Sequence, residues 1–198
     1  MRKLANTAIK CLLLSLMWVP ISGLKAQDFS AGFSMLEKGQ FVEARSFFSE
    51  QLQKDSSNFT ALICYGRATG LSGNILESQG IFRKLLIMKP GNVEVLLNLA
   101  ESYLWDKNGK QAADLYVKII TDQPDNFAAT LGYANSLSMT KQYEKAYQFI
   151  HKALQLEPNN AQAKVSRKFI RLGYADYLAA QQGEYEKALE LVNDNLLD

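Results

Sequence analysis

A repeat of about 34 residues constrains this chain more than any other feature of its sequence. Several sets of equivalent positions keep that interval: an asparagine set, a proline set, two sets of small residues and one set of large apolar residues. Their members are Asn58, Asn92, Asn126 and Asn160; Pro90, Pro124 and Pro158, with Ser56 at the preceding position; Ala44, Ser78, Ala112 and Ala146; Gly32, Gly66, Ala100 and Ala134; and Phe48, Phe82, Tyr116 and Ile150. A fixed period of this length is typical of solenoids, in which one structural unit is stacked several times.

The residue types within one period fit a pair of antiparallel α-helices. Small residues let two helices cross closely, and the large apolar residues fill the space beside them. Each proline ends a second helix, because proline inside a helix loses a hydrogen bond and clashes with the preceding turn. The asparagine two positions later can cap the next helix through its side-chain oxygen. Apolar residues recur at intervals of three and four, as in Leu96, Leu99 and Tyr103, so each helix has one apolar face. The sequence therefore predicts an all-α fold.

Several stretches resemble the tetratricopeptide repeat (TPR) family. They are KQYEKA at residues 141–146, ALQLEPNN at 153–160 and QGEYEKAL at 182–189. The resemblance covers residues 25–194. It implies a right-handed α-solenoid of about five helix-turn-helix units, with repeats at about 25–58, 59–92, 93–126, 127–160 and 161–198.

The fifth repeat departs from the period. The interval from Ala146 to Ala188 is longer than the regular one, and no proline occurs between Ala161 and Gln182. The inserted residues predict one long first helix in this repeat, about two turns longer than its predecessors.

Residues 1–26 have the pattern of a signal peptide. Arg2, Lys3 and Lys10 form a basic start, an apolar run follows to about Leu24, and Ala26 is a small residue suited to cleavage. We therefore expect a mature solenoid of residues 27–198, exported to the periplasm or secreted. An uncleaved membrane anchor is the alternative. Without the four cations of residues 1–26, 18 basic residues face 20 acidic ones, a net charge of −2. That balance argues against a nucleic-acid partner.

The inventory of catalytic residues is small. His151 is the only histidine, and Cys64 is the only cysteine after the predicted signal peptide. Neither a zinc site nor a Cys–His pair can be assembled from them, and no glycine-rich phosphate loop is present. We expect no enzyme activity, no metal and no cofactor.

Binding of a protein or peptide is the function that the TPR resemblance implies. In this family the first helices of the repeats line a concave groove, which would be mostly apolar here. The equivalent positions are Phe29, Phe33, Ile63, Arg67, Leu97, Glu101, Trp105, Leu131, Asn135, Met139, Tyr177 and Gln181. The alternative for some of these residues is packing under the neighbouring repeat. The clamp for terminal carboxylates found in chaperone-binding members is not reproduced, because its first-repeat positions hold Phe29 and Phe33.

Two further surfaces stand out near the C-terminus. One is a basic face on the long helix, formed by Lys164, Arg167, Lys168 and Arg171. It is either a solvated face or a contact for an acidic partner or an anionic membrane surface. The other is the apolar stripe of the last helix, formed by Tyr185, Leu189, Val192 and Leu196. It predicts a homodimer through that end; the alternatives are partial masking by Asn193, Asp194 and Asn195, and a chain shortened from a longer ancestor.

Two functional hypotheses follow. The first is an exported adaptor that binds a partner in its groove within an envelope assembly, with membrane association only through that partner. Related bacterial repeat proteins often stand beside outer-membrane export and assembly machinery. The second is a self-associating structural module that uses the C-terminal helix.

Overall fold

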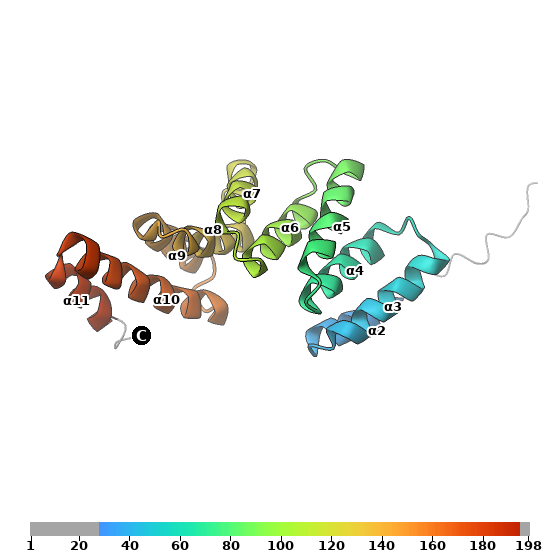
Figure 1. Ribbon diagram of the computed structural model, residues 1–198, viewed down its shortest axis with the longest axis horizontal. Coiled ribbons are helices and arrows are strands. Elements are labelled where there is room, and N and C mark those ends of the chain that lie inside the picture. Colours follow the sequence, from blue (N-terminus) through green and yellow to red (C-terminus); the bar gives the residue numbers. More distant parts are fainter. Residues whose placement is uncertain (1–27, 195–198) are drawn as a thin grey trace, which may run out of the picture. The chain divides into compact units, whose positions relative to one another are not determined.

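The computed structural model describes residues 28–194 of the chain. The predicted signal peptide and Leu196 lie outside these residues. The described part is helical throughout and contains no strand (Figure 1). Its helices are α2 (Ser30–Glu37), α3 (Phe41–Lys54), α4 (Phe59–Leu71), α5 (Ile75–Met88), α6 (Val93–Trp105), α7 (Gly109–Asp122), α8 (Phe127–Met139), α9 (Tyr143–Leu156), α10 (Ala161–Tyr177), the π-helical segment η1 (Leu178–Gln182) and α11 (Tyr185–Asp194).

The chain divides into two compact units, Met1–Ala31 and Gly32–Asp198. In the described part of the first, the Ser30 amide donates a hydrogen bond to Asp28 Oδ1 at 2.9 Å, at the start of α2. In the second, each helix from α3 to α11 packs against the next along the chain, and α4, α6, α8 and α10 also contact one another in turn. Stacked helix pairs of this kind form an α-solenoid, which confirms the predicted fold class. The limits of the predicted repeats stay a prediction.

The asparagine set marks the start of each first helix after the first repeat. The side-chain oxygens of Asn58, Asn92, Asn126 and Asn160 each accept a hydrogen bond, at 3.0 Å, from the backbone N–H three positions later. This contact satisfies a donor that the helix itself leaves unpaired. The predicted caps are therefore confirmed.

The small and large sets build the core as predicted. Phe48, Phe82 and Ile150 are fully buried, and so are Ala44, Ser78, Ala112 and Ala146 at the small positions. A Cβ atom on Gly66 would lie 3.0 Å from the Phe82 ring. The small residue on the first helix is therefore needed to accommodate the aromatic ring of the second.

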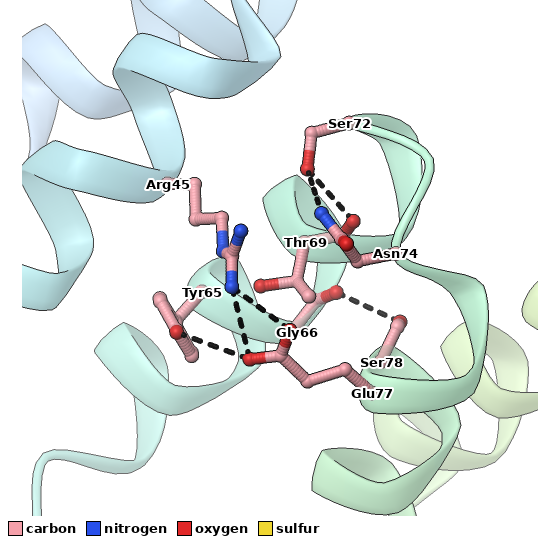
Figure 2. Close-up of polar contacts among 8 residues, drawn as sticks. All are labelled: Arg45, Tyr65, Gly66, Thr69, Ser72, Asn74, Glu77 and Ser78. Atoms are coloured by element: carbon pink, nitrogen blue, oxygen red, sulfur yellow. Dashed lines mark hydrogen bonds and ion pairs between the residues drawn. The ribbon is translucent and has the colours of Figure 1, made fainter.

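Polar contacts join α3, α4 and α5 (Figure 2). The Arg45 guanidinium of α3 donates to both carboxylate oxygens of Glu77 on α5, at 2.8 and 3.1 Å, and Tyr65 of α4 donates to the same carboxylate at 3.4 Å. Inside the pair, the buried Ser78 hydroxyl donates to the Gly66 carbonyl oxygen at 2.8 Å. The Arg45–Glu77 bonds tie the first repeat to the second, and the other two bonds join the helices of the second repeat to each other.

The inserted residues of the fifth repeat lengthen the C-terminal end of its first helix. The helices α4, α6 and α8 have 13 residues each, whereas α10 has 17 and continues into the π-helical segment η1. Gly183, with a φ of 68°, ends the segment, a backbone conformation that glycine adopts without strain. Because Asn160 still caps α10 in phase, the start of this helix keeps the register of the earlier repeats.

Candidate partner-binding site

A cavity of about 330 Å³ lies along the first helices, and we call it the central cavity. Its walls come from α4, α6, α8 and the start of α10, with one residue from α7. The lining residues are Arg67, Glu94, Leu97, Asn98, Glu101, Leu104, Tyr116, Phe127, Ala128, Leu131, Gly132, Asn135 and Gln162. A volume of this size is within the usual range for a ligand site.

Five residues predicted to line the groove meet in this cavity: Arg67, Leu97, Glu101, Leu131 and Asn135. They converge because the repeat places equivalent residues on adjacent helices. Arg67, Glu101 and Asn135 follow one another at the regular interval, and so do Leu97 and Leu131. Since α4, α6 and α8 pack in turn, one row of equivalent positions becomes a continuous wall.

The electrostatics of the central cavity are dominated by the carboxylate of Glu101. Burial raises the pKa of this half-buried carboxyl, and the positive charge of Arg67 offsets only part of the rise. The neighbouring Tyr116 hydroxyl also has a raised pKa, caused by burial and then by the charge of Glu101. Arg67 itself is exposed. The cavity therefore holds an acidic group that is short of solvent and near an accessible guanidinium.

The lining is more polar than the sequence analysis predicted. Glu94, Asn98 and Gln162 contribute polar side chains, and the Asn98 amide donates to the Glu94 carbonyl oxygen at 2.7 Å. The repeat could have identified most of these residues. Glu94, Ala128 and Gln162 form one series at the regular interval, and Asn98 and Gly132 form another.

Other predicted groove residues lie outside the central cavity. Ile63 is buried in the core. Trp105 packs on Gly70, where a Cβ atom would lie 2.4 Å from its Cζ3 atom, and Met139 packs against Gly109 in a similar way. All three take part in contacts between helices, but Met139 is also 43% exposed, and a role for Trp105 or Met139 in partner binding stays a prediction.

The two groove residues predicted in the first repeat, Phe29 and Phe33, do not line the central cavity either. Phe33 is 42% exposed and lines a cavity of about 290 Å³ with Leu36, Glu37, Leu71 and Arg67. Phe29 precedes α2 in the N-terminal unit. A role for Phe29 or Phe33 in partner binding stays a prediction.

Tyr177 lies near the end of α10. Its ring centroid is 5.7 Å from that of Tyr143, and both line a second cavity of about 470 Å³ beside η1. Tyr177 is equivalent to Asn135 only if the longer interval of the fifth repeat applies along its first helix. The register of α10 instead aligns Val165 with Leu131 and Phe169 with Asn135, and both are exposed.

Only part of the predicted basic face is exposed to solvent. Lys164 and Lys168 are exposed and Arg167 is half-buried. Arg171 is buried, and its guanidinium donates to the Leu191 carbonyl oxygen of α11 at 3.1 Å. Arg171 is thus a contact between two helices, a correction to its predicted place on an exposed face, because α11 covers this side of α10.

The described residues assemble no group of three or more metal-binding side chains. Burial, followed by the charge of Glu94, raises the pKa of the Cys64 thiol to about 11, which disfavours the reactive thiolate. The central cavity is suited to binding a ligand, because it offers hydrogen-bond donors, a carboxylate and apolar walls. No helix within residues 28–194 combines the length and the apolar character needed to cross a bilayer.

The sequence and the structure were compared with those of known proteins. Residues 106–167 match the sequence model of a tetratricopeptide repeat family. No curated protein sequence matches the chain closely enough to serve as a relative. Among solved structures, MamA from Desulfovibrio magneticus RS-1 is 17% identical over 84% of this chain and 90% of that chain, with a TM-score of 0.66. The structure named MamA AMB-1 is 21% identical over 84% of this chain and 94% of that chain, also with a TM-score of 0.66.

A tetratricopeptide repeat protein from Parabacteroides merdae ATCC 43184 is similar as well. It is 18% identical over 84% of this chain and 64% of that chain, with a TM-score of 0.59. At such low identities the likeness concerns the fold alone. The chain therefore has the fold of a tetratricopeptide-repeat solenoid, and residues 106–167 also match that family in sequence.

Proposed function

We propose that this chain is an exported TPR adaptor that binds an extended segment of a partner protein in the central cavity, within an assembly of the cell envelope. The observation that carries the proposal is the convergence of Arg67, Glu101 and Asn135 with Leu97 and Leu131 around one cavity. A wall built from successive helices suits a ligand that runs across them. A TPR fold supports a role in protein interaction, and the signal-peptide pattern of residues 1–26 supports export.

The chemistry of the cavity indicates what the segment carries. The half-buried carboxylate of Glu101 loses solvation that a donor on the ligand would replace, either a backbone N–H or the side chain of a lysine or arginine. Arg67 and Asn135 can donate to carbonyl oxygens of the same segment. Leu97, which is half-buried, provides an apolar contact for one side chain, whereas Leu131 is buried in the core that supports the wall. The preferred ligand is therefore an extended segment with a basic residue next to an apolar one.

Site-specific photocrosslinking can identify this segment. A photoreactive residue replaces Leu97, which is half-buried and lines the cavity, and the control replaces Ile87, which is 81% exposed on α5. We expect one partner to be captured from position 97 and not from position 87. Equal capture at both positions would rule out the central cavity as the site.

The captured segment, made as a peptide, then allows direct measurement of affinity. Glu101→Gln keeps the shape of the side chain but removes its charge, and Glu43→Gln on the exposed face of α3 is the matched control. A charged hydrogen bond is worth about 1.5–3 kcal/mol, so we expect at least about tenfold weaker binding for Glu101→Gln. Glu43→Gln leaves the affinity unchanged.

The proposed adaptor is not an enzyme. It would contact a membrane only through its partner. The predicted alternative, self-association through the C-terminal helix, concerns a different surface.

A further inference from the structure

The two C-terminal helices carry exposed apolar stripes with the same spacing. The α10 stripe consists of Val165, Phe169 and Leu172, which are 53%, 69% and 46% exposed. The α11 stripe consists of Tyr185, Leu189 and Val192, which are 71%, 61% and 38% exposed. In both, intervals of four and then three place the side chains on one face of the helix.

The charges beside the two stripes are opposite. Lys164 and Lys168 directly precede Val165 and Phe169 on α10, and both lysines are exposed. Glu186 and Glu190 directly follow Tyr185 and Leu189 on α11, and both glutamates are exposed. Lys187 points to another side of α11, where it forms an ion pair with Glu184 at 2.8 Å.

The order of the residues sets the direction in which the stripes fit. On a helix, the residue before an apolar position and the residue after it lie on opposite sides of the stripe. When two parallel helices face each other, these opposite sides meet, as they do at the flanks of a parallel coiled coil. A parallel arrangement therefore brings the lysines of α10 against the glutamates of α11. It also aligns the apolar residues one to one, because both stripes run four and then three.

Within one chain the two stripes do not meet. The α11 of the same chain covers a different side of α10, where Arg171 donates to the Leu191 carbonyl oxygen and Ala175, Leu178 and Ala188 are buried together. One molecule thus carries both complementary stripes. Each stripe remains available for contact with another copy of the chain.

We propose that the α11 stripe of one copy docks in parallel on the α10 stripe of a second copy. This inference goes beyond the proposed adaptor function, because it assigns a self-association surface outside the central cavity. The contact is heterologous: each copy offers one α10 stripe and one α11 stripe, and joining two copies leaves one stripe of each kind open. Association of this type continues head to tail unless the assembly closes into a ring.

Two single variants and their mixture test this directionality. Phe169→Asp disables the α10 stripe and Leu189→Asp disables the α11 stripe; both positions are exposed, so the fold is expected to tolerate the change. In sedimentation velocity, the mass of the wild type rises with concentration, whereas each variant alone stays monomeric. Their equimolar mixture forms a one-to-one dimer, since each variant keeps the half that the other lacks.

Charge reversal provides a second test. Two double variants reverse the charges beside the stripes: Lys164→Glu with Lys168→Glu on α10, and Glu186→Lys with Glu190→Lys on α11. Each double variant alone weakens self-association by about tenfold. Mixing these two proteins restores association, because the reversed charges on one chain now match those on the other. Circular dichroism of each variant checks that its helices are intact.

Several results would overturn the proposal. They are a wild type that stays monomeric at all concentrations, a mixture of Phe169→Asp and Leu189→Asp that stays monomeric, or charge-reversed proteins that associate like the wild type. A monomeric wild type that sediments with phosphatidylglycerol vesicles would instead assign the α10 stripe to a membrane surface. Neither Phe169 nor Leu189 lines the central cavity, and the purified proteins are measured without a partner, so this readout is independent of partner binding.

Discussion

Replacing Gly70 by alanine tests whether the contact between the second and third repeats depends on a missing side chain. A Cβ atom at this position would lie 2.4 Å from Trp105 Cζ3 and 2.8 Å from Ser78 Oγ. Ser78 does not move easily, because it is fully buried and its hydroxyl is held by the Gly66 carbonyl oxygen. Gly80, also inside a helix, has no atom within 4 Å of the added Cβ and is the matched control.

The two substitutions have opposite expected signs. Alanine in place of glycine inside a helix stabilises by about 0.5–1 kcal/mol, and Gly80→Ala should show this gain in full. At Gly70 the same gain is outweighed by overpacking, which costs about 1–3 kcal/mol. We expect Gly70→Ala to lower the free energy of unfolding by roughly 1–2 kcal/mol.

Urea unfolding followed by far-UV circular dichroism measures both changes. Combining Gly70→Ala with Trp105→Leu tests the cause, because the smaller side chain leaves room for the Cβ atom. The cost of Gly70→Ala should then largely disappear, a non-additivity expected only for residues in contact. If Gly70→Ala stabilises as Gly80→Ala does, or costs the same with and without Trp105, the packing argument is refuted.

Three further predictions concern capping, a buried charge and an ion pair. Asn126→Ala removes the acceptor for the Ala129 amide and should lower the free energy of unfolding by about 1 kcal/mol; Asn74→Ala, at a helix start without a side-chain cap, should change it much less in the same urea titration. Glu101→Gln should raise the free energy of unfolding at pH values above the raised pKa of Glu101, where the wild type carries a poorly solvated charge. This gain should shrink as the pH falls through that pKa, since the protonated wild type no longer carries the penalty; a gain that grows in acid would contradict the assignment. Glu77→Gln should lower the free energy of unfolding by no more than about 1 kcal/mol, because the Arg45–Glu77 pair is partly exposed; the effect should fade in high salt, and a loss independent of salt would count against an electrostatic origin.

The features that the sequence predicts well are those with one local physical cause. An asparagine two positions after a proline caps a helix at Asn92, Asn126 and Asn160, and Asn58 forms the same cap at the equivalent repeat position, two positions after Ser56. The small and large sets meet in the core because each pair lies within one repeat. Arg67, Glu101 and Asn135 share a wall because the repeat period carries their register from helix to helix.

The features that the sequence does not predict depend on which helix covers which surface. Arg171 has the spacing of an exposed basic face, yet α11 covers it. Trp105 has the register of a groove residue, and its ring also packs beside Gly70 on the neighbouring first helix, a contact that the repeat pattern does not indicate; its role in partner binding stays a prediction. In the fifth repeat, the longer interval does not say where the inserted residues enter. They lengthen the end of α10, so the register at Val165 and Phe169 is unchanged.

The most direct test of the central cavity as a partner-binding site is a calorimetric titration of the crosslinked segment into wild type and Glu101→Gln. Affinity at least about tenfold weaker for Glu101→Gln, together with a free energy of unfolding at neutral pH that is equal to or above that of the wild type, is the predicted result. It would show that the buried charge is kept for binding at the expense of stability. Unchanged affinity would contradict partner binding in the central cavity.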